Sequence, residues 1–167
     1  MALTISYRLV GTGWSECTVD DGRSHCTLKA SYLSDALGNL VMAASAAMAG
    51  FTRLSFEFEE EPGESRWVIY SPQPNDLDLE VFEFKALSTG KPDADGRSIF
   101  QARCLPVEFA KAVHAAAEQV LQEYGEKGYL EKWAEHPFPL KQMSVLRDQI
   151  EAVERGTQNR SAPAPLK

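Results

Sequence analysis

The fold is decided by residues 54–70, which read LSFEFEEEPGESRWVIY. Leu54, Phe56 and Phe58 alternate with polar residues, which is the period-two pattern of a strand with one buried face. Residues 61–64 contain the Pro-Gly pair of a turn, and an apolar run follows them. The pattern therefore predicts an antiparallel hairpin. The expected pairs are Phe56 with Ile69, Phe58 with Trp67, and Glu59 with Arg66.

A second hairpin is predicted before this one. Residues 3–19 and 24–30 both look like strands, and an Asp-Gly pair at 21–22 lies between them. Asp-Gly between two such runs is a strong signal for a two-residue hairpin loop. A loop of this length places Cys17 directly opposite Cys26.

Two irregularities are expected in the strands. Gly11 and Gly13 indicate a bend or bulge within the strand over residues 3–19. In residues 77–84 the alternation of apolar side chains slips by one position. We therefore expect a β-bulge near Val81 and Phe82 that restores a single apolar face.

Helices are predicted between the two hairpins and at the C-terminal end. Residues 35–49 carry apolar side chains at helical spacing, with Ser34 as the expected N-cap and Gly50 as the stop. Because the rest of this helix is largely alanine, we expect it to be covered on more than one side. The later helices are predicted over residues 106–124 (ended by Gly125), 129–135 and 140–155.

These elements indicate the α+β class. We expect a mainly antiparallel sheet of about six strands, with one inserted helix and with C-terminal helices packed on one face. The length of 167 residues favours one domain, over residues 1–155. Residues 156–167 have almost nothing to bury and are expected to form a flexible tail.

The composition is that of an ordinary globular protein, with 44% hydrophobic and 25% charged residues. The N-terminus lacks the features of a secretory signal, and no stretch is long and apolar enough for a membrane span, so we expect a cytoplasmic location. The three cysteines do not form the pattern of a disulfide framework, so reduced thiols are expected. Neither a metal site nor a cofactor is indicated, because the ligand spacings of zinc and the glycine patterns of nucleotide loops are missing.

No catalytic motif emerges from the sequence. His25, His114 and His136 lie near no Ser or Cys in a nucleophile motif, so we expect solvated or capping histidines. Residues 93–96 read DADG, but the other ligands of a calcium loop are missing. The net charge of −7 and the scattered basic residues disfavour nucleic acid as a partner. The sequence therefore does not predict an enzyme.

Acidic residues are concentrated in one segment. Residues 57–83 hold nine acids and one base, Arg66, so this segment sums to −8 and the rest of the chain to +1. Because opposed charges speed encounter, we expect an acidic sheet face that docks a basic partner. The candidate partner-binding residues are Glu57, Glu59, Glu60, Glu61, Glu64, Asp78 and Glu80. The alternative is a solvated face whose charges keep the sheet edge from pairing with other molecules.

Three stretches carry a resemblance to a known group of proteins. They are residues 31–44 (SYLSDALGNLVMAA), 59–68 (EEEPGESRWV) and 123–140 (EYGEKGYLEKWAEHPFPL). They are similar to an uncharacterised family of small bacterial cytoplasmic proteins, which resemble the immunity proteins of polymorphic toxin systems. The resemblance covers residue 3 to about residue 155 and carries over no functional residue. It implies a stoichiometric binder that blocks a toxin, and an acidic face suits toxins that are basic.

The leading hypothesis is therefore a non-enzymatic binding protein of the immunity type. One alternative is a small-molecule binder, in which a bent sheet under helices encloses an apolar pocket. The expected lining of that pocket is Phe56, Phe58, Phe82, Phe84 and Tyr124. A further alternative is a homo-oligomeric structural protein that associates through the alanine-rich helix or through the seam from Met143 to Val153.

Overall fold

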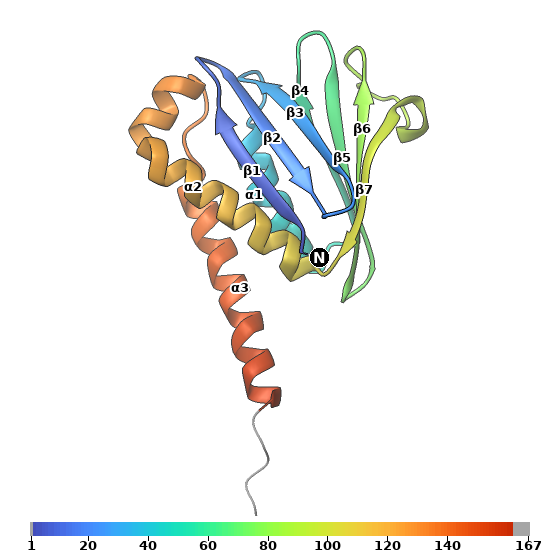
Figure 1. Ribbon diagram of the computed structural model, residues 1–167, viewed down its shortest axis with the longest axis vertical. Coiled ribbons are helices and arrows are strands. Elements are labelled where there is room, and N and C mark those ends of the chain that lie inside the picture. The colour runs from blue at the N-terminus through green and yellow to red at the C-terminus, as the bar shows by residue number, and fades with distance from the viewer. Residues whose placement is uncertain (1, 162–167) are drawn as a thin grey trace, which may run out of the picture.

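The computed structural model describes residues 2–161, which form seven β-strands, three α-helices and one 3-10 helix (Figure 1). The strands are β1 (Thr4–Leu9), β2 (Trp14–Asp20), β3 (His25–Ser31), β4 (Arg53–Glu59), β5 (Glu64–Gln73), β6 (Asp76–Phe84) and β7 (Arg97–Cys104). The helices are α1 (Ala36–Met48), the 3-10 helix η1 (Asp93–Asp95), α2 (Pro106–Trp133) and α3 (Leu140–Ser161). The predicted α+β class is confirmed.

The strands form two antiparallel sheets, so the expected single sheet of about six strands is wrong. The sheet orders are β1-β2-β3 and β4-β5-β6-β7, and β3 contacts β4 without sharing a ladder with it. The difference arises in residues 3–19, which were expected to be one strand. Gly11 and Gly13 take φ values of 61° and 79°, which glycine adopts without strain, and the chain reverses there. β1 and β2 therefore pair as a hairpin.

The β2–β3 hairpin has a longer loop than the Asp-Gly pair predicted. Cys17 pairs with Leu28 instead of Cys26, so the predicted register is wrong by two positions. The Asp21 carboxylate accepts hydrogen bonds from the backbone N–H groups of residues 23 and 24, at 2.9 and 2.8 Å, which stabilises a four-residue loop. A shift of two keeps each side chain on its predicted face. Both cysteines are buried and free.

The β4–β5 hairpin also differs from its prediction in register, although its loop keeps the predicted length of four residues. Phe56 pairs with Trp67, and Glu57 pairs with Arg66, so the predicted pairs are again two positions off. The loop begins one residue earlier than expected because the Glu60 N–H donates to the Gly63 carbonyl, at 2.8 Å. The apolar and polar faces stay as predicted, since the shift is an even number of residues.

Phe82 and Phe84 lie on the opposite face of the sheet from the one predicted. A register shift does occur at Val81–Phe82, but it lies in the pairing of β6 with β7. The extra residue is Ile99 of β7. β6 stays in continuous register with β5 at this point. Alternation therefore points Val81 into the core. It points Phe82 and Phe84 to the outer face, which is the face of the four-stranded sheet directed away from the core.

Helix α1 lies in the centre of the molecule, as its uncharged sequence predicted. Asp35, and not Ser34, is its N-cap, because the Asp35 carboxylate accepts a hydrogen bond from the Gly38 N–H at 3.2 Å. α1 contacts α2, α3 and β4, so the prediction of a helix covered on more than one side is confirmed. Ser45 of α1 also donates a hydrogen bond to Gln149 of α3, at 2.8 Å.

The C-terminal helices follow the predicted breaks with one exception. Gly125 departs from helical geometry (φ 65°, ψ 174°) and separates the two predicted segments within α2. α3 continues to Ser161, so the predicted end of this helix at Arg155 is wrong. Its second half, from residue 151 onward, is exposed and extends beyond the sheets (Figure 1). The remainder of the expected tail, residues 162–167, lies outside the described residues.

A continuous hydrophobic core contains residues from both sheets and from all three α-helices. Part of it is an aromatic stack in which the rings of Phe56 and Trp67 lie 5.5 Å apart at an angle of 15°, with Phe58 tilted against them. Among residues 2–161, no helix combines the length and the hydropathy that crossing a membrane requires.

Candidate functional site

The candidate partner-binding residues lie on or beside the outer face of the four-stranded sheet. Alternation sends Trp67 and Ile69 of β5 into the core and Arg66, Val68 and Tyr70 to this outer face. The structure divides the seven candidates into three groups. These are Glu57 and Glu64 beside Arg66, Asp78 and Glu80 beside β7, and Glu59, Glu60 and Glu61 at the β4–β5 turn.

Arg66 holds the β6–β7 loop, residues 85–96, against the outer face. Its side chain is only 8% exposed. The guanidinium donates hydrogen bonds to the backbone carbonyls of Ser88 and Lys91, at 3.1 and 2.8 Å, and to the Ser88 hydroxyl at 2.8 Å. It also pairs with the Asp93 carboxylate at 2.8 Å. Four contacts thus tie one buried cation to a loop that has no strand of its own.

Glu64 and Glu57 complete this cluster instead of facing a partner. Glu64 was expected to face solvent, and this is wrong, because the side chain is buried under the β6–β7 loop. Its Oε1 accepts a hydrogen bond from the Ser88 N–H at 3.0 Å. Burial raises the pKa of the Glu64 carboxyl above its usual range. The Glu57 carboxylate lies 3.6 Å from Arg66 Nε.

Asp78 and Glu80 also have partners within the sheet. Arg103 Nε donates a hydrogen bond to Asp78 Oδ1 at 2.8 Å, and this contact raises the pKa of Arg103. Glu80 Oε1 accepts hydrogen bonds from the Ser98 hydroxyl at 2.7 Å and from Gln101 Nε2 at 2.6 Å. Both carboxylates are therefore engaged by side chains of β7.

A shallow groove of about 670 Å³ separates this part of the sheet from the β2–β3 loop. Val68 and Tyr70 contribute apolar surface to it, while Arg23 and Arg103 line it together with Asp78 and other acids. Because the lining carries both signs of charge, the groove does not single out a basic partner.

The remaining three candidates differ from the others. We call Glu59, Glu60 and Glu61 the acidic tip, at the turn between β4 and β5 (Figure 1). Within the described residues, none of their carboxylates has a hydrogen-bond or ion-pair partner. The tip borders a hollow of about 340 Å³ that is also lined by Val10, Trp14 and Lys29. The charged residues of its lining are three acids, Glu16, Glu60 and Glu61, and one base, Lys29, so an excess of acidic residues lies beside apolar surface here.

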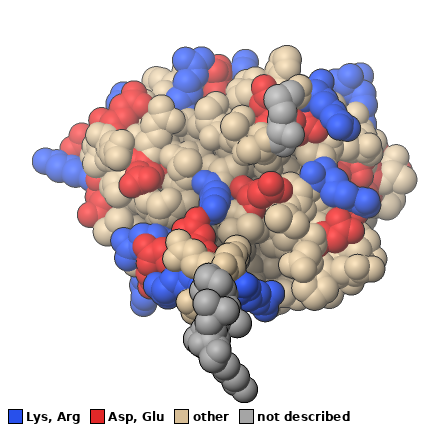
Figure 2. Space-filling model, turned by 60° about the horizontal axis from the view of Figure 1, so that its bottom comes forward, with Lys and Arg blue, Asp and Glu red and all other residues tan. Residues whose placement is uncertain are grey.

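Two arginines of β7 pair with three of the nine acids that the sequence places on residues 57–83. Arg97 pairs with Glu83 at 2.8 Å, and Arg103 lies between Asp76 and Asp78, at 3.4 and 2.8 Å. On the face that Figure 2 presents, charged side chains of both signs are interspersed, and no large area of one sign is visible. The sequence did not reveal these pairs, because a polar loop separates β7 from the acidic segment.

The apolar cavity predicted for a small-molecule binder does not form. Its expected lining was Phe56, Phe58, Phe82, Phe84 and Tyr124. Phe56 is stacked on Trp67 within the packed core. Phe84 lies on the other side of the sheet, with the Arg66 guanidinium 4.5 Å from its ring centre. Tyr124 belongs to α2, and its hydroxyl donates a 3.4 Å hydrogen bond to a carbonyl of β1.

The three histidines belong to different parts of the fold. His25 lies opposite Asp20 in the ladder between β2 and β3. His114 lines a hollow between α2 and α3. His136 follows α2, and its Nε2 is buried without a hydrogen-bond partner among the described residues. Within residues 2–161, no group of three or more His, Cys, Asp or Glu side chains could hold a metal ion.

Comparison with protein-family models, with curated proteins and with solved structures gave no match.

Proposed function

We propose that this protein is a non-enzymatic cytoplasmic binding protein that docks a basic protein partner through its acidic tip. The supporting observation is how the candidate carboxylates are engaged. Glu57, Glu64, Asp78 and Glu80 have partners within the chain, whereas the three carboxylates of the acidic tip have none among the described residues. Unpaired carboxylates at a hairpin turn repel one another and attract an incoming cation.

The hollow beside the acidic tip gives the partner an apolar contact. Trp14 is half-buried there, and Val10 is 39% exposed. Aromatic side chains that a partner can desolvate contribute strongly to binding energy. A lysine or arginine of the partner suits this site, because its stem can cover Trp14 and Val10 while its charge reaches the tip.

The kind of partner rests on the sequence resemblance. An immunity-type inhibitor binds its toxin stoichiometrically, and a basic toxin complements the acidic tip. The competing explanation is that the tip only keeps β4 from pairing with another molecule, since charged side chains protect sheet edges. The two explanations differ in whether a partner depends on the tip carboxylates.

Capture of partners from a lysate of the protein's own cell distinguishes them. The wild type is compared with the triple variant Glu59→Gln, Glu60→Gln and Glu61→Gln. A matched control carries Glu126→Gln, Glu135→Gln and Glu151→Gln, which remove the same three charges from exposed positions of the C-terminal region. Both variants change the net charge equally, so a difference between them reports the position of the charges.

We expect a basic protein that the wild type and the control variant retain at low salt, that the tip variant does not retain, and that salt releases. Equal retention by the tip variant would contradict the proposed docking site. Failure of the wild type to retain any basic protein would contradict the proposed function.

A further inference from the structure

Apolar side chains are exposed on two loops beside the acidic tip. Val10, in the β1–β2 turn, is 39% exposed, and Trp14 at the start of β2 is half-buried. Tyr32 and Leu33, in the loop between β3 and α1, are 36% and 46% exposed. We call these four side chains the apolar patch. Figure 1 shows both loops and the β4–β5 turn at the same end of the molecule, opposite the free end of α3.

Hydrogen bonds fix the two loops to each other and to the acidic tip. The Tyr32 N–H donates to the Gly13 carbonyl at 2.9 Å, which joins the β3–α1 loop to the β1–β2 turn. The Glu59 N–H donates a longer bond of 3.4 Å to the Ser34 hydroxyl. The loop that carries half of the apolar patch therefore reaches the first residue of the acidic tip.

The other half of the apolar patch meets the acidic tip across the hollow between them. Val10 and Trp14 line this hollow together with two carboxylates of the tip. Lys29 is the one base of the lining, and it lies opposite Glu16 in the β2–β3 ladder, so the acids remain in excess. The apolar patch and the acidic tip are thus parts of one continuous surface.

The two kinds of surface restrict what can cover both of them. An apolar segment would remove the tip carboxylates from water without supplying a cation, and burying an unpaired charge is costly. A segment that carries only cations would pair with the carboxylates but would gain nothing from the apolar patch, since covering apolar surface is favourable only with another apolar surface. A segment that complements the whole surface therefore carries both kinds of side chain.

We propose that the acidic tip and the apolar patch together bind a protein segment in which basic and apolar residues are interspersed. This inference rests on the proposed function and names the chemistry of the partner at that same site. The carboxylates of the tip speed association, because charges steer the encounter of two proteins. The apolar patch slows dissociation, because desolvated aromatic contacts supply much of the binding energy at an interface.

Two synthetic peptides of equal length and charge test this chemistry by isothermal titration calorimetry at low salt. One peptide alternates lysine with phenylalanine, and the other alternates lysine with serine. The wild type should bind the phenylalanine peptide at least about tenfold more tightly, as expected for desolvation of an aromatic contact. The double variant Tyr32→Ala and Leu33→Ala should lose most of this preference, because it keeps every charge and removes half of the apolar patch.

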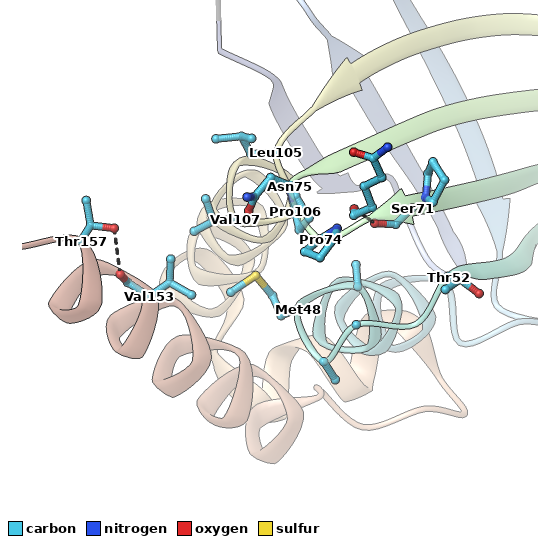
Figure 3. Close-up of a pocket in the computed structure, with 15 residues that line it drawn as sticks. Met48, Thr52, Ser71, Pro74, Asn75, Leu105, Pro106, Val107, Val153 and Thr157 are labelled. Atoms are coloured by element: carbon cyan, nitrogen blue, oxygen red, sulfur yellow. Dashed lines mark hydrogen bonds between the residues drawn. The ribbon is translucent and has the colours of Figure 1, made fainter. Parts of the chain in front are cut away.

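Tyr70→Ala with Leu105→Ala is the matched control, because these side chains are 46% and 44% exposed. Leu105 lines an uncharged groove between α1, α2 and α3 (Figure 3). β5 runs from Glu64, next to the β4–β5 turn, to Gln73, which lines the same groove. Ten residues of strand span roughly 30 Å, so Leu105 lies far from the acidic tip. Circular dichroism checks that both double variants fold.

The control variant should prefer the phenylalanine peptide as strongly as the wild type does. The triple variant of the acidic tip should bind both peptides more weakly and keep the preference between them. Equal affinity of the wild type for the two peptides overturns this inference, and so does a preference that Tyr32→Ala with Leu33→Ala leaves unchanged. Neither of these results contradicts the proposed function, which the capture of a basic protein by the wild type and by the tip variant decides.

Discussion

Replacing Arg66 by methionine tests whether one buried cation holds the β6–β7 loop. Methionine keeps most of the stem but removes the guanidinium, and with it the bonds to Ser88, Lys91 and Asp93. The Ser88 side chain is completely buried and would lose its donor. Arg103→Met is the matched control, because Arg103 also pairs with two carboxylates of this sheet, but its side chain is 70% exposed.

The expected effects differ because of burial. Removing one partner of a buried ion pair destabilises a protein by about 3–5 kcal/mol. The Asp93 side chain is 28% exposed and can regain water, so we expect a loss of about 3 kcal/mol for Arg66→Met. That is a large share of the roughly 5–15 kcal/mol that stabilises a typical domain. Arg103→Met should lose only about 0–1 kcal/mol, because exposed ion pairs contribute little.

Urea unfolding followed by circular dichroism measures both losses. With a slope of about 1–3 kcal/mol per molar urea, Arg66→Met should lower the unfolding midpoint by roughly 1–3 M. Limited proteolysis should also cut the variant within residues 85–96 before the rest of the chain, since the loop loses its anchor. Equal losses for the two variants, or a loss below about 1 kcal/mol for Arg66→Met, would refute this account of the loop.

Three further predictions concern stability. Burial raises the pKa of the Glu64 carboxyl in the folded state above its value in the unfolded chain. The folded state therefore loses stability as the pH rises from the unfolded-state pKa to the folded-state pKa. Glu64→Gln should remove this loss, so the free energy of unfolding in urea at neutral pH should be unchanged or higher. Gly96→Ala should lower the melting temperature, because its Cβ would lie 2.7 Å from the Phe84 ring, whereas Gly156→Ala, with open space around it in the exposed end of α3, should change the melting temperature little. Ending the chain after Arg155 removes only exposed helix from the described residues, so the melting temperature should change little; a fall of several degrees would show that the removed segment packs on the body.

Side-chain alternation carried most of what could be predicted about the sheets. The faces of Phe56, Phe58 and Trp67 are as expected even though the hairpin register is two positions off. The register depends on loop geometry, such as the hydrogen bonds that the Asp21 carboxylate accepts, and a two-letter turn signal does not specify it. A register shift by an even number of residues leaves each side chain on its predicted face, so alternation cannot distinguish the two registers.

The errors concern contacts between segments that lie far apart in the sequence. Nothing in residues 85–96 indicated that this polar loop would cover Glu64 and bind Arg66. The break in the alternation of apolar residues at Val81 predicts a bulge within β6. Instead, β6 stays in register with β5 there, and the Phe84 ring lies on the outer face under Arg66. Local charge counting likewise could not reveal the pairing of the acidic segment with Arg103.

The acidic tip is the part of the predicted site on which the proposed function now depends. Neutralising Glu59, Glu60 and Glu61 should leave folding intact or slightly firmer, because each exposed pair of like charges interacts by only about 0.2–1 kcal/mol and the repulsion disappears with the charges. An effect on binding can therefore be separated from an effect on folding by comparing unfolding curves of the variant and the wild type.

The most direct test is the association rate of the captured basic partner, measured by surface plasmon resonance at several salt concentrations. We expect the tip variant to associate more slowly than the wild type, with an association rate that depends less on salt, and we expect the dissociation rate to change less than the association rate. The control variant with Glu126, Glu135 and Glu151 replaced should bind at close to the wild-type rate. An association rate for the tip variant equal to that of the wild type would contradict the proposal that the acidic tip docks a partner.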